Sequence, residues 1–85
     1  MNTKHRNTLK AIFYTPTRSN ISFSDIEALV KAMMGGKVID REGTRVILSV
    51  AYGLWHTHRP HPSHEVKKYQ VESFLDFLKL KGIEP

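Results

Sequence analysis

The chain has 85 residues, a formal net charge of +5 and no cysteine. This length fits one small domain, and the lack of cysteine excludes a disulfide scaffold and a zinc site built on thiolates. No apolar run approaches the roughly 18 residues that span a bilayer, and the N-terminus lacks the apolar segment of a secretory signal, so we expect no membrane partner and a cytoplasmic location. The excess of Lys and Arg favours a polyanionic or acidic partner, although a basic surface can also serve solubility alone.

Two helices are expected first. Residues 4–14 predict a short helix that ends before Pro16, because proline disfavours the helical conformation of the residue before it. After a polar connector, a second helix is expected to start at Ser22 or Ser24, since Ser24-x-x-Glu27 has the form of a capping box, and to stop at Gly35-Gly36. Its apolar residues recur at helical spacing: Ile26, Leu29, Val30 and Met33.

Three strands are expected next, at residues 37–41, 44–51 and 54–59, joined by turns at Glu42-Gly43 and Tyr52-Gly53. Short turns between consecutive strands imply an antiparallel meander. Side chains alternate along the second strand, with Val46, Leu48 and Val50 on one side and Arg45, Ile47 and Ser49 on the other. One face of the sheet is therefore expected to pack on helices and the other to face outward.

A final helix is expected from about Glu65 to Lys81, after Pro60-His61-Pro62 breaks the sheet, with Gly82 as its stop. Its apolar stripe consists of Val71, Phe74, Leu75 and Leu78, widened by Phe77 and Leu80. The order of elements predicts an α+β fold, a three-stranded antiparallel sheet with helices packed on one face. We expect two parts, an N-terminal helical extension at 1–20 and a binding domain at 21–85.

Imidazole and basic side chains concentrate on the third strand and beyond it. If Trp55 faces inward, because an indole is costly to leave in water, then His56 and His58 face outward near Arg45 of the neighbouring strand. A slip of one residue in register would exchange the two faces. The candidates for binding RNA phosphates are Arg41, Arg45, Arg59, His61, Lys67 and Lys68.

His56 and His58 are the catalytic candidates. Histidine has an ordinary pKa near about 6.5, so one imidazole can accept the proton of a ribose 2′-hydroxyl while another donates to the leaving oxygen, with no cofactor. Other interpretations remain open: His56-x-His58 also suits a metal site, although cysteine is absent and acidic residues are few nearby. His61, between two prolines, also fits a structural turn residue, and Lys67-Lys68 a solvated helix face.

Three groups of residues occur together at the spacing of a known family. They are Gly43-Thr44, Pro60-His61-Pro62, and a set in the last helix made of Phe74, Phe77, Leu78, Lys79, Gly82 and Ile83. Over about residues 22–84 the chain resembles the HicA toxins of bacterial toxin–antitoxin pairs. The resemblance implies a fold like the double-stranded-RNA-binding domain, binding and cleavage of mRNA, and neutralisation by a HicB-like antitoxin.

One departure from the family bears on the chemistry. HicA toxins usually have Gly-Ser-His-His where this chain has Gly43-Thr44-Arg45-Val46, and a histidine of that motif is catalytic. Arginine stays charged and cannot act as a general base near neutral pH. Either His56 or His58 on the neighbouring strand performs the proton transfer, or the chain binds RNA or an antitoxin without cutting RNA. A domain whose basic face binds an acidic protein is a third possibility.

Overall fold

The computed structural model describes residues 1–60 and 64–85. Within them the elements are α1 (Thr3–Phe13), α2 (Phe23–Ala32), β1 (Lys37–Asp40), β2 (Arg45–Val50), β3 (Gly53–His58) and α3 (Lys68–Leu80). The strands form one antiparallel sheet in the order β1-β2-β3. The expected α+β class and the three-stranded meander are confirmed. No helix among the described residues is long and apolar enough to cross a bilayer.

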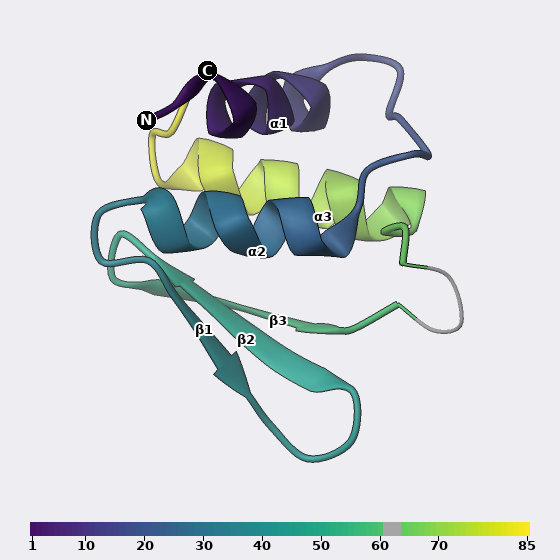
Figure 1. Ribbon diagram of the computed structural model, residues 1–85, viewed down its shortest axis with the longest axis vertical. Coiled ribbons are helices and arrows are strands. Elements are labelled where there is room, and N and C mark those ends of the chain that lie inside the picture. Colours follow the sequence, from purple (N-terminus) through teal and green to yellow (C-terminus); the bar gives the residue numbers. More distant parts are fainter. Residues whose placement is uncertain (61–63) are drawn as a thin grey trace.

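All three helices lie on the same side of the sheet (Figure 1). α2 contacts β1 and β2, α3 contacts β3, and α1 packs on α2 and α3 without reaching the strands. Leu9 and Ile12 of α1 are buried in the same core cluster as Leu48 of β2 and Phe74 of α3. The molecule is therefore built in three layers around one core, and α1 completes the cover of the other two helices.

The orientation of Trp55 fixes which side chains of the sheet face inward. Its side chain is buried, its ring centroid lies 4.8 Å from that of Phe74, and its Nε1–H donates to Ser73 Oγ at 3.0 Å. Trp55 lies opposite Leu48, which is also buried. The indole is thus shielded from water with its N–H satisfied, as a buried tryptophan requires. The expected inward position of Trp55 is confirmed, and with it the strand register.

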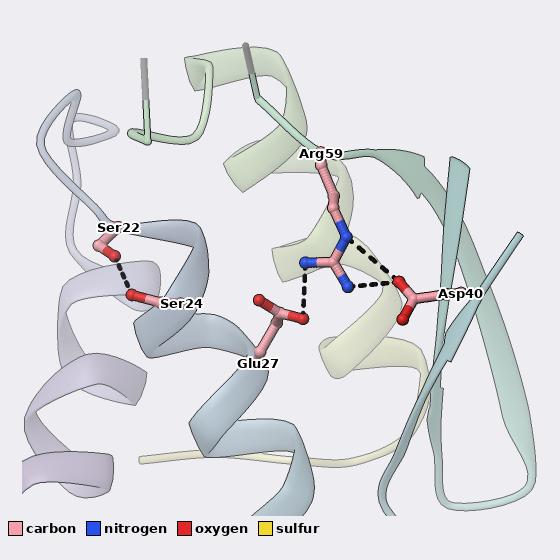
Figure 2. A network of polar contacts seen from close by, with 5 residues as sticks. All are labelled: Ser22, Ser24, Glu27, Asp40 and Arg59. Atoms are coloured by element: carbon pink, nitrogen blue, oxygen red, sulfur yellow. Dashed lines mark hydrogen bonds and ion pairs between the residues drawn. The ribbon is translucent and has the colours of Figure 1, made fainter. Parts of the chain in front are cut away.

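The start of α2 differs from the expected capping box. Ser22 is the N-cap residue, but its side chain makes no capping hydrogen bond, and its Oγ lies 2.7 Å from Ser24 Oγ (Figure 2). The Glu27 carboxylate does not return to the helix start; its Oε2 lies 2.8 Å from Nη1 of Arg59. The prediction of a Ser24-x-x-Glu27 capping box is therefore wrong. The Glu27 carboxylate binds an arginine that is distant in the sequence and not the start of its own helix.

α3 begins at Lys68 and not near Glu65. The segment before it is extended: Glu65 forms an antiparallel bridge with Ser22, and the N–H of Val66 donates to the carbonyl oxygen of Ile21 at 2.8 Å. This bridge pairs the segment before α2 with the segment before α3. Because the second segment is extended, α3 starts later than expected. Leu80, expected in the apolar stripe, is 86% exposed because it lies on the side of the last turn away from the core.

The turn between β2 and β3 lies one residue earlier than expected, at Ala51 and Tyr52, whose φ angles are 49° and 64°. Val50 pairs with Gly53, so this is a two-residue turn with positive φ at both positions, the form that Asn and Gly normally supply. Each L side chain costs about 1–2 kcal/mol in this conformation. Gly53 is the first residue of β3, and packing explains why it is a glycine. A Cβ at this position would lie 3.1 Å from Phe77 Cε1 and closer still to Lys81.

Candidate functional site

The sheet face turned away from the helices, here called the outer face, carries three cross-strand rows of side chains. Between β2 and β3, Arg45 lies opposite His58, Ile47 opposite His56, and Ser49 opposite Leu54. Opposite residues on antiparallel strands share a face, so a third residue, on β1, lies in the same row as each of these pairs. The full outer face consists of Lys37, Ile39, Arg41, Arg45, Ile47, Ser49, Leu54, His56 and His58. None of these residues is acidic.

Four of the predicted site residues meet at one end of the outer face. Arg41, Arg45, His56 and His58 line a pocket of about 360 Å³, and all four are exposed. Ile47 also lines the pocket and is only 5% exposed, although it does not belong to the core cluster between sheet and helices. Because Ile47 is buried but lies outside the core, the neighbouring side chains of the outer face cover it. Both catalytic candidates and two RNA-binding candidates are therefore brought together.

Arg45 and His58 form the closest type of cross-strand pair. The N–H of Arg59 donates to the carbonyl oxygen of Thr44 at 2.8 Å, so Thr44 and Arg59 are a hydrogen-bonded pair. Pairs alternate along an antiparallel ladder, which makes the next pair, Arg45 and His58, non-hydrogen-bonded. In such pairs the Cα atoms lie about 4.5 Å apart and the side chains are closer than elsewhere. A guanidinium and an imidazole can thus reach the same phosphate group.

The position of His58 is fixed at both its ring and its backbone. Thr44 Oγ1 lies 3.2 Å from His58 Nδ1. Gln70, which is buried, donates from Nε2 to His58 O at 2.9 Å and to Thr57 Oγ1 at 2.8 Å. The Gln70 Oε1 atom accepts the N–H of Lys67 at 3.1 Å. Because Nδ1 is engaged with Thr44, Nε2 is the ring nitrogen of His58 that remains for a substrate.

Arg59 follows the last residue of β3, does not line this pocket, and joins its segment to α2 and β1 (Figure 2). Its Nη1 lies 2.8 Å from Glu27 Oε2 on α2, its Nε donates to Asp40 Oδ1 on β1 at 3.2 Å, and Nη2 pairs with the same oxygen. The guanidinium also lies 5.5 Å from the ring centroid of Phe23. The hydrogen bond to Asp40, together with Glu27, raises the pKa of Arg59, while burial acts in the opposite direction. The charge of Arg59 is therefore engaged inside the chain.

The remaining RNA-binding candidates lie near the end of α3 or outside the described residues. Lys67 is the N-cap of α3 and Lys68 its first residue, and both are exposed. The bonds of Gln70 to β3 place this helix start at the His58 end of the strand. His61 lies outside the described residues. Among residues 1–60 and 64–85, no three histidine or acidic side chains are grouped so that they could hold a metal ion.

A second pocket lies at the other end of the outer face, where the sequence predicts no site. Lys37, Ser49 and Tyr52 line it, with a volume of about 350 Å³. The Tyr52 side chain is fully exposed, and Leu54 beside Ser49 is 56% exposed. Tyr52 was predicted only as a turn residue. An aromatic residue in place of the usual Asn or Gly of a tight turn is the signal that could have marked it.

No family model, curated protein or solved structure matches the chain. Any assignment of function therefore depends on the residues and geometry described above.

Proposed function

We propose that this chain is a HicA-like toxin of a type II toxin–antitoxin pair, which binds mRNA in the cytoplasm and cleaves it as a metal-independent ribonuclease. Its protein partner would be a HicB-like antitoxin. The observation that carries the proposal is the pocket in which His56 and His58 stand beside Arg41 and Arg45. The order of α2, the three strands and α3 agrees with the double-stranded-RNA-binding-domain-like fold that the resemblance to HicA implies.

The charge of the outer face supports an RNA ligand. Lys37, Arg41 and Arg45 supply three cations, and no carboxylate stands among the outer-face residues. Basic side chains gathered on one face bind the phosphate backbone and release its counterions. The one arginine near this end that we leave out of the phosphate-binding set is Arg59, because Glu27 and Asp40 already neutralise it.

The two imidazoles suit cleavage through the ribose 2′-hydroxyl. His58 accepts the 2′-hydroxyl proton at Nε2, and the 2′-oxygen forms a bond to the adjacent phosphorus. The bond from phosphorus to the 5′-oxygen breaks, and protonated His56 donates its proton to that oxygen, leaving a 2′,3′-cyclic phosphate and a 5′-hydroxyl. We assign the base role to His58 because Thr44 and Gln70 hold it in place. Arg45 would bind the non-bridging oxygens as charge develops on them.

The proposal accounts for the departure from the family motif. Arg45 occupies an outward position of the segment where HicA toxins carry histidine, whereas Val46 is buried. His58 lies directly opposite Arg45. An imidazole is thus available about 5 Å away on the same face, one strand further along. In this proposal arginine and histidine have divided the two tasks of phosphate binding and proton transfer.

The experiment that tests the proposal is incubation of the purified, partner-free protein with a long single-stranded RNA in EDTA, read on a denaturing gel. We expect cleavage by the wild type and none by the His56→Ala, His58→Ala double variant. His64→Ala is the matched control, because His64 is exposed and does not line the pocket, and it should cleave normally. Intact RNA with the wild type would contradict the ribonuclease activity.

A second function, an inactive module that binds RNA or an antitoxin, is favoured by one observation, the arginine in place of the family histidine. It predicts a shift of RNA on a native gel at low salt with no cleavage product. Because phosphate contacts release counterions, that shift should weaken steeply as salt rises. Cleavage that depends on His56 and His58 would exclude this alternative.

A further inference from the structure

The two pockets of the outer face lie at opposite ends of β2. The first contains Arg45 and His58, and the second contains Ser49, Lys37 and Tyr52. From Arg45 to Ser49 the strand advances about 14 Å, at about 3.4 Å per residue. The surface between them is formed by Ile47 and its row and carries no acidic side chain. An extended chain lying along β2 would meet basic groups at both ends.

Tyr52 is held in a conformation that its side chain does not favour. Its φ is 64° and that of Ala51 is 49°. Asn or Gly would form this turn with less strain, and the exposed ring is not used in the core. Backbone strain that packing does not explain is often found at functional sites, which makes the ring a candidate binding group.

The combination of features fits an unpaired nucleotide better than a protein. The outer face has basic side chains at both ends of β2 and an aromatic ring at one of them. Proteins that bind single-stranded nucleic acids without regard to sequence combine basic side chains for the phosphates with aromatic rings for the bases. Every base offers a flat face to an aromatic ring, whereas bases inside a duplex are already stacked on each other. Lys37 lines the same pocket as Tyr52, so a phosphate contact and a stacking contact are available together.

We propose that the outer face binds single-stranded RNA along β2, with the reacting phosphate in the pocket of Arg45 and His58 and an unpaired base stacked on Tyr52. This rests on the proposed RNA-binding function and deepens it: the substrate is single-stranded, and Tyr52 is a base-binding residue separate from the proton-transfer groups.

The first test measures affinity by fluorescence anisotropy with a labelled single-stranded 2′-O-methyl RNA, which has no 2′-hydroxyl to attack the phosphate. Tyr52→Asn removes the ring and tolerates positive φ, so it should be at least as stable as the wild type. We expect its affinity to fall about tenfold, the scale of one lost stacking contact, while Tyr52→Phe keeps the affinity. On a duplex of the same sequence, Tyr52→Asn should bind as the wild type does.

A second test locates the stacked base with a series of the same oligonucleotides, each with one abasic position. For the wild type, one position should lower affinity, and in Tyr52→Asn that same abasic substitution should have no further effect. Unchanged RNA affinity of a folded Tyr52→Asn would overturn the inference while leaving RNA binding intact. An equal loss on duplex would overturn the preference for single strands. A wild type that binds no RNA would refute the proposed function itself.

Discussion

Arg45 on β2 and His58 on β3 face each other on the outer face of the sheet, as a non-hydrogen-bonded pair. Neither residue is adjacent to the other in the sequence, yet their Cβ atoms are as close as those of any two residues on paired strands. If the function requires one imidazole and one guanidinium at this pair of positions, with His56 unchanged, their exchange across the two strands should be tolerated.

The exchange can be tested with Arg45→His combined with His58→Arg. His58→Arg alone should abolish cleavage of a labelled RNA in EDTA, because arginine does not accept a proton near neutral pH. The double variant should recover cleavage to within about tenfold of the wild type, since the imidazole returns about 5 Å away. A double variant as inactive as His58→Arg would show that the place of the imidazole is not interchangeable.

Thr44 should act as a positioning residue for His58. Thr44→Val removes the hydroxyl that lies 3.2 Å from His58 Nδ1 and keeps the side-chain shape. We expect kcat to fall about tenfold with KM unchanged, the effect of one lost hydrogen bond, and the acidic limb of the pH–rate profile, which reports the general base, to move. Thr44→Ser should restore both. A Thr44→Val enzyme with normal kcat and an unaltered pH profile would remove Thr44 from the mechanism.

Arg59 should contribute to stability more than to RNA binding. Arg59→Ala should destabilise the fold by about 1–2 kcal/mol and lower Tm by roughly 5–10 °C. Glu27→Gln should cost more than Asp40→Asn, because the Glu27 side chain is 19% exposed and that of Asp40 is 73% exposed. Thermal unfolding of the three variants gives the order. A larger loss for Asp40→Asn would contradict this account.

The pKa of Arg59 also gives a sign for its pH dependence. It is raised above the ordinary arginine value, so the stability it contributes is fully present below that value and is lost only as pH rises through the higher folded value. Between pH 5 and 9 Arg59 should therefore cause no change in stability. A pH dependence of Tm in that range that disappears in Arg59→Ala would contradict the assignment.

Gln70 should be essential for the His58 end of β3. Gln70→Leu removes a buried donor from Thr57 Oγ1 and His58 O. Leaving these acceptors without that partner should cost about 2 kcal/mol and lower Tm by roughly 10 °C. Glu72→Leu, on the exposed side of the same helix, is the control and should change Tm little. Circular dichroism melting of both variants tests this prediction. Equal Tm values for Gln70→Leu and Glu72→Leu would contradict it.

α1 should be part of the folding unit. Ile12 is 1% exposed and belongs to the core cluster that reaches β2 and α3. Ile12→Ala should therefore destabilise the domain by about 2–4 kcal/mol, as large-to-small core substitutions do. Lys10→Ala on the exposed side of α1 is the control. Urea unfolding of the full chain measures both, and an Ile12→Ala midpoint equal to the wild type would mean that α1 does not share the core.

Much of the sheet could be predicted because its pattern is local. Strand side chains alternate with a period of two, so the burial of Val46 and Trp55 also placed Arg45, His56 and His58 on the opposite face. The turn could not be placed as well, because Gly53 was predicted to be a residue of the turn. In the structure that glycine instead makes room for the side chains of α3.

The use of the charged side chains could not be predicted, since ion pairs form between residues that are distant in sequence. Arg59 was expected to bind phosphate together with Arg45, and Glu27 was expected to cap its own helix. In the structure Arg59 and Glu27 bind each other, and Asp40 joins them. The local sequence around these residues does not predict their ion-pair partners, because the partners depend on how α2 packs on the sheet.

The sequence by itself determined the order of the helices and strands and, once Trp55 is taken to face inward, that two imidazoles and a guanidinium share a surface. These follow from local periodicity and from the cost of exposing apolar side chains. Only the tertiary structure decided that Arg45 is opposite His58, that Arg59 is neutralised, and that Tyr52 stands at the far end of the same face. Those relationships depend on register and packing, which join parts of the chain that have no local influence on one another.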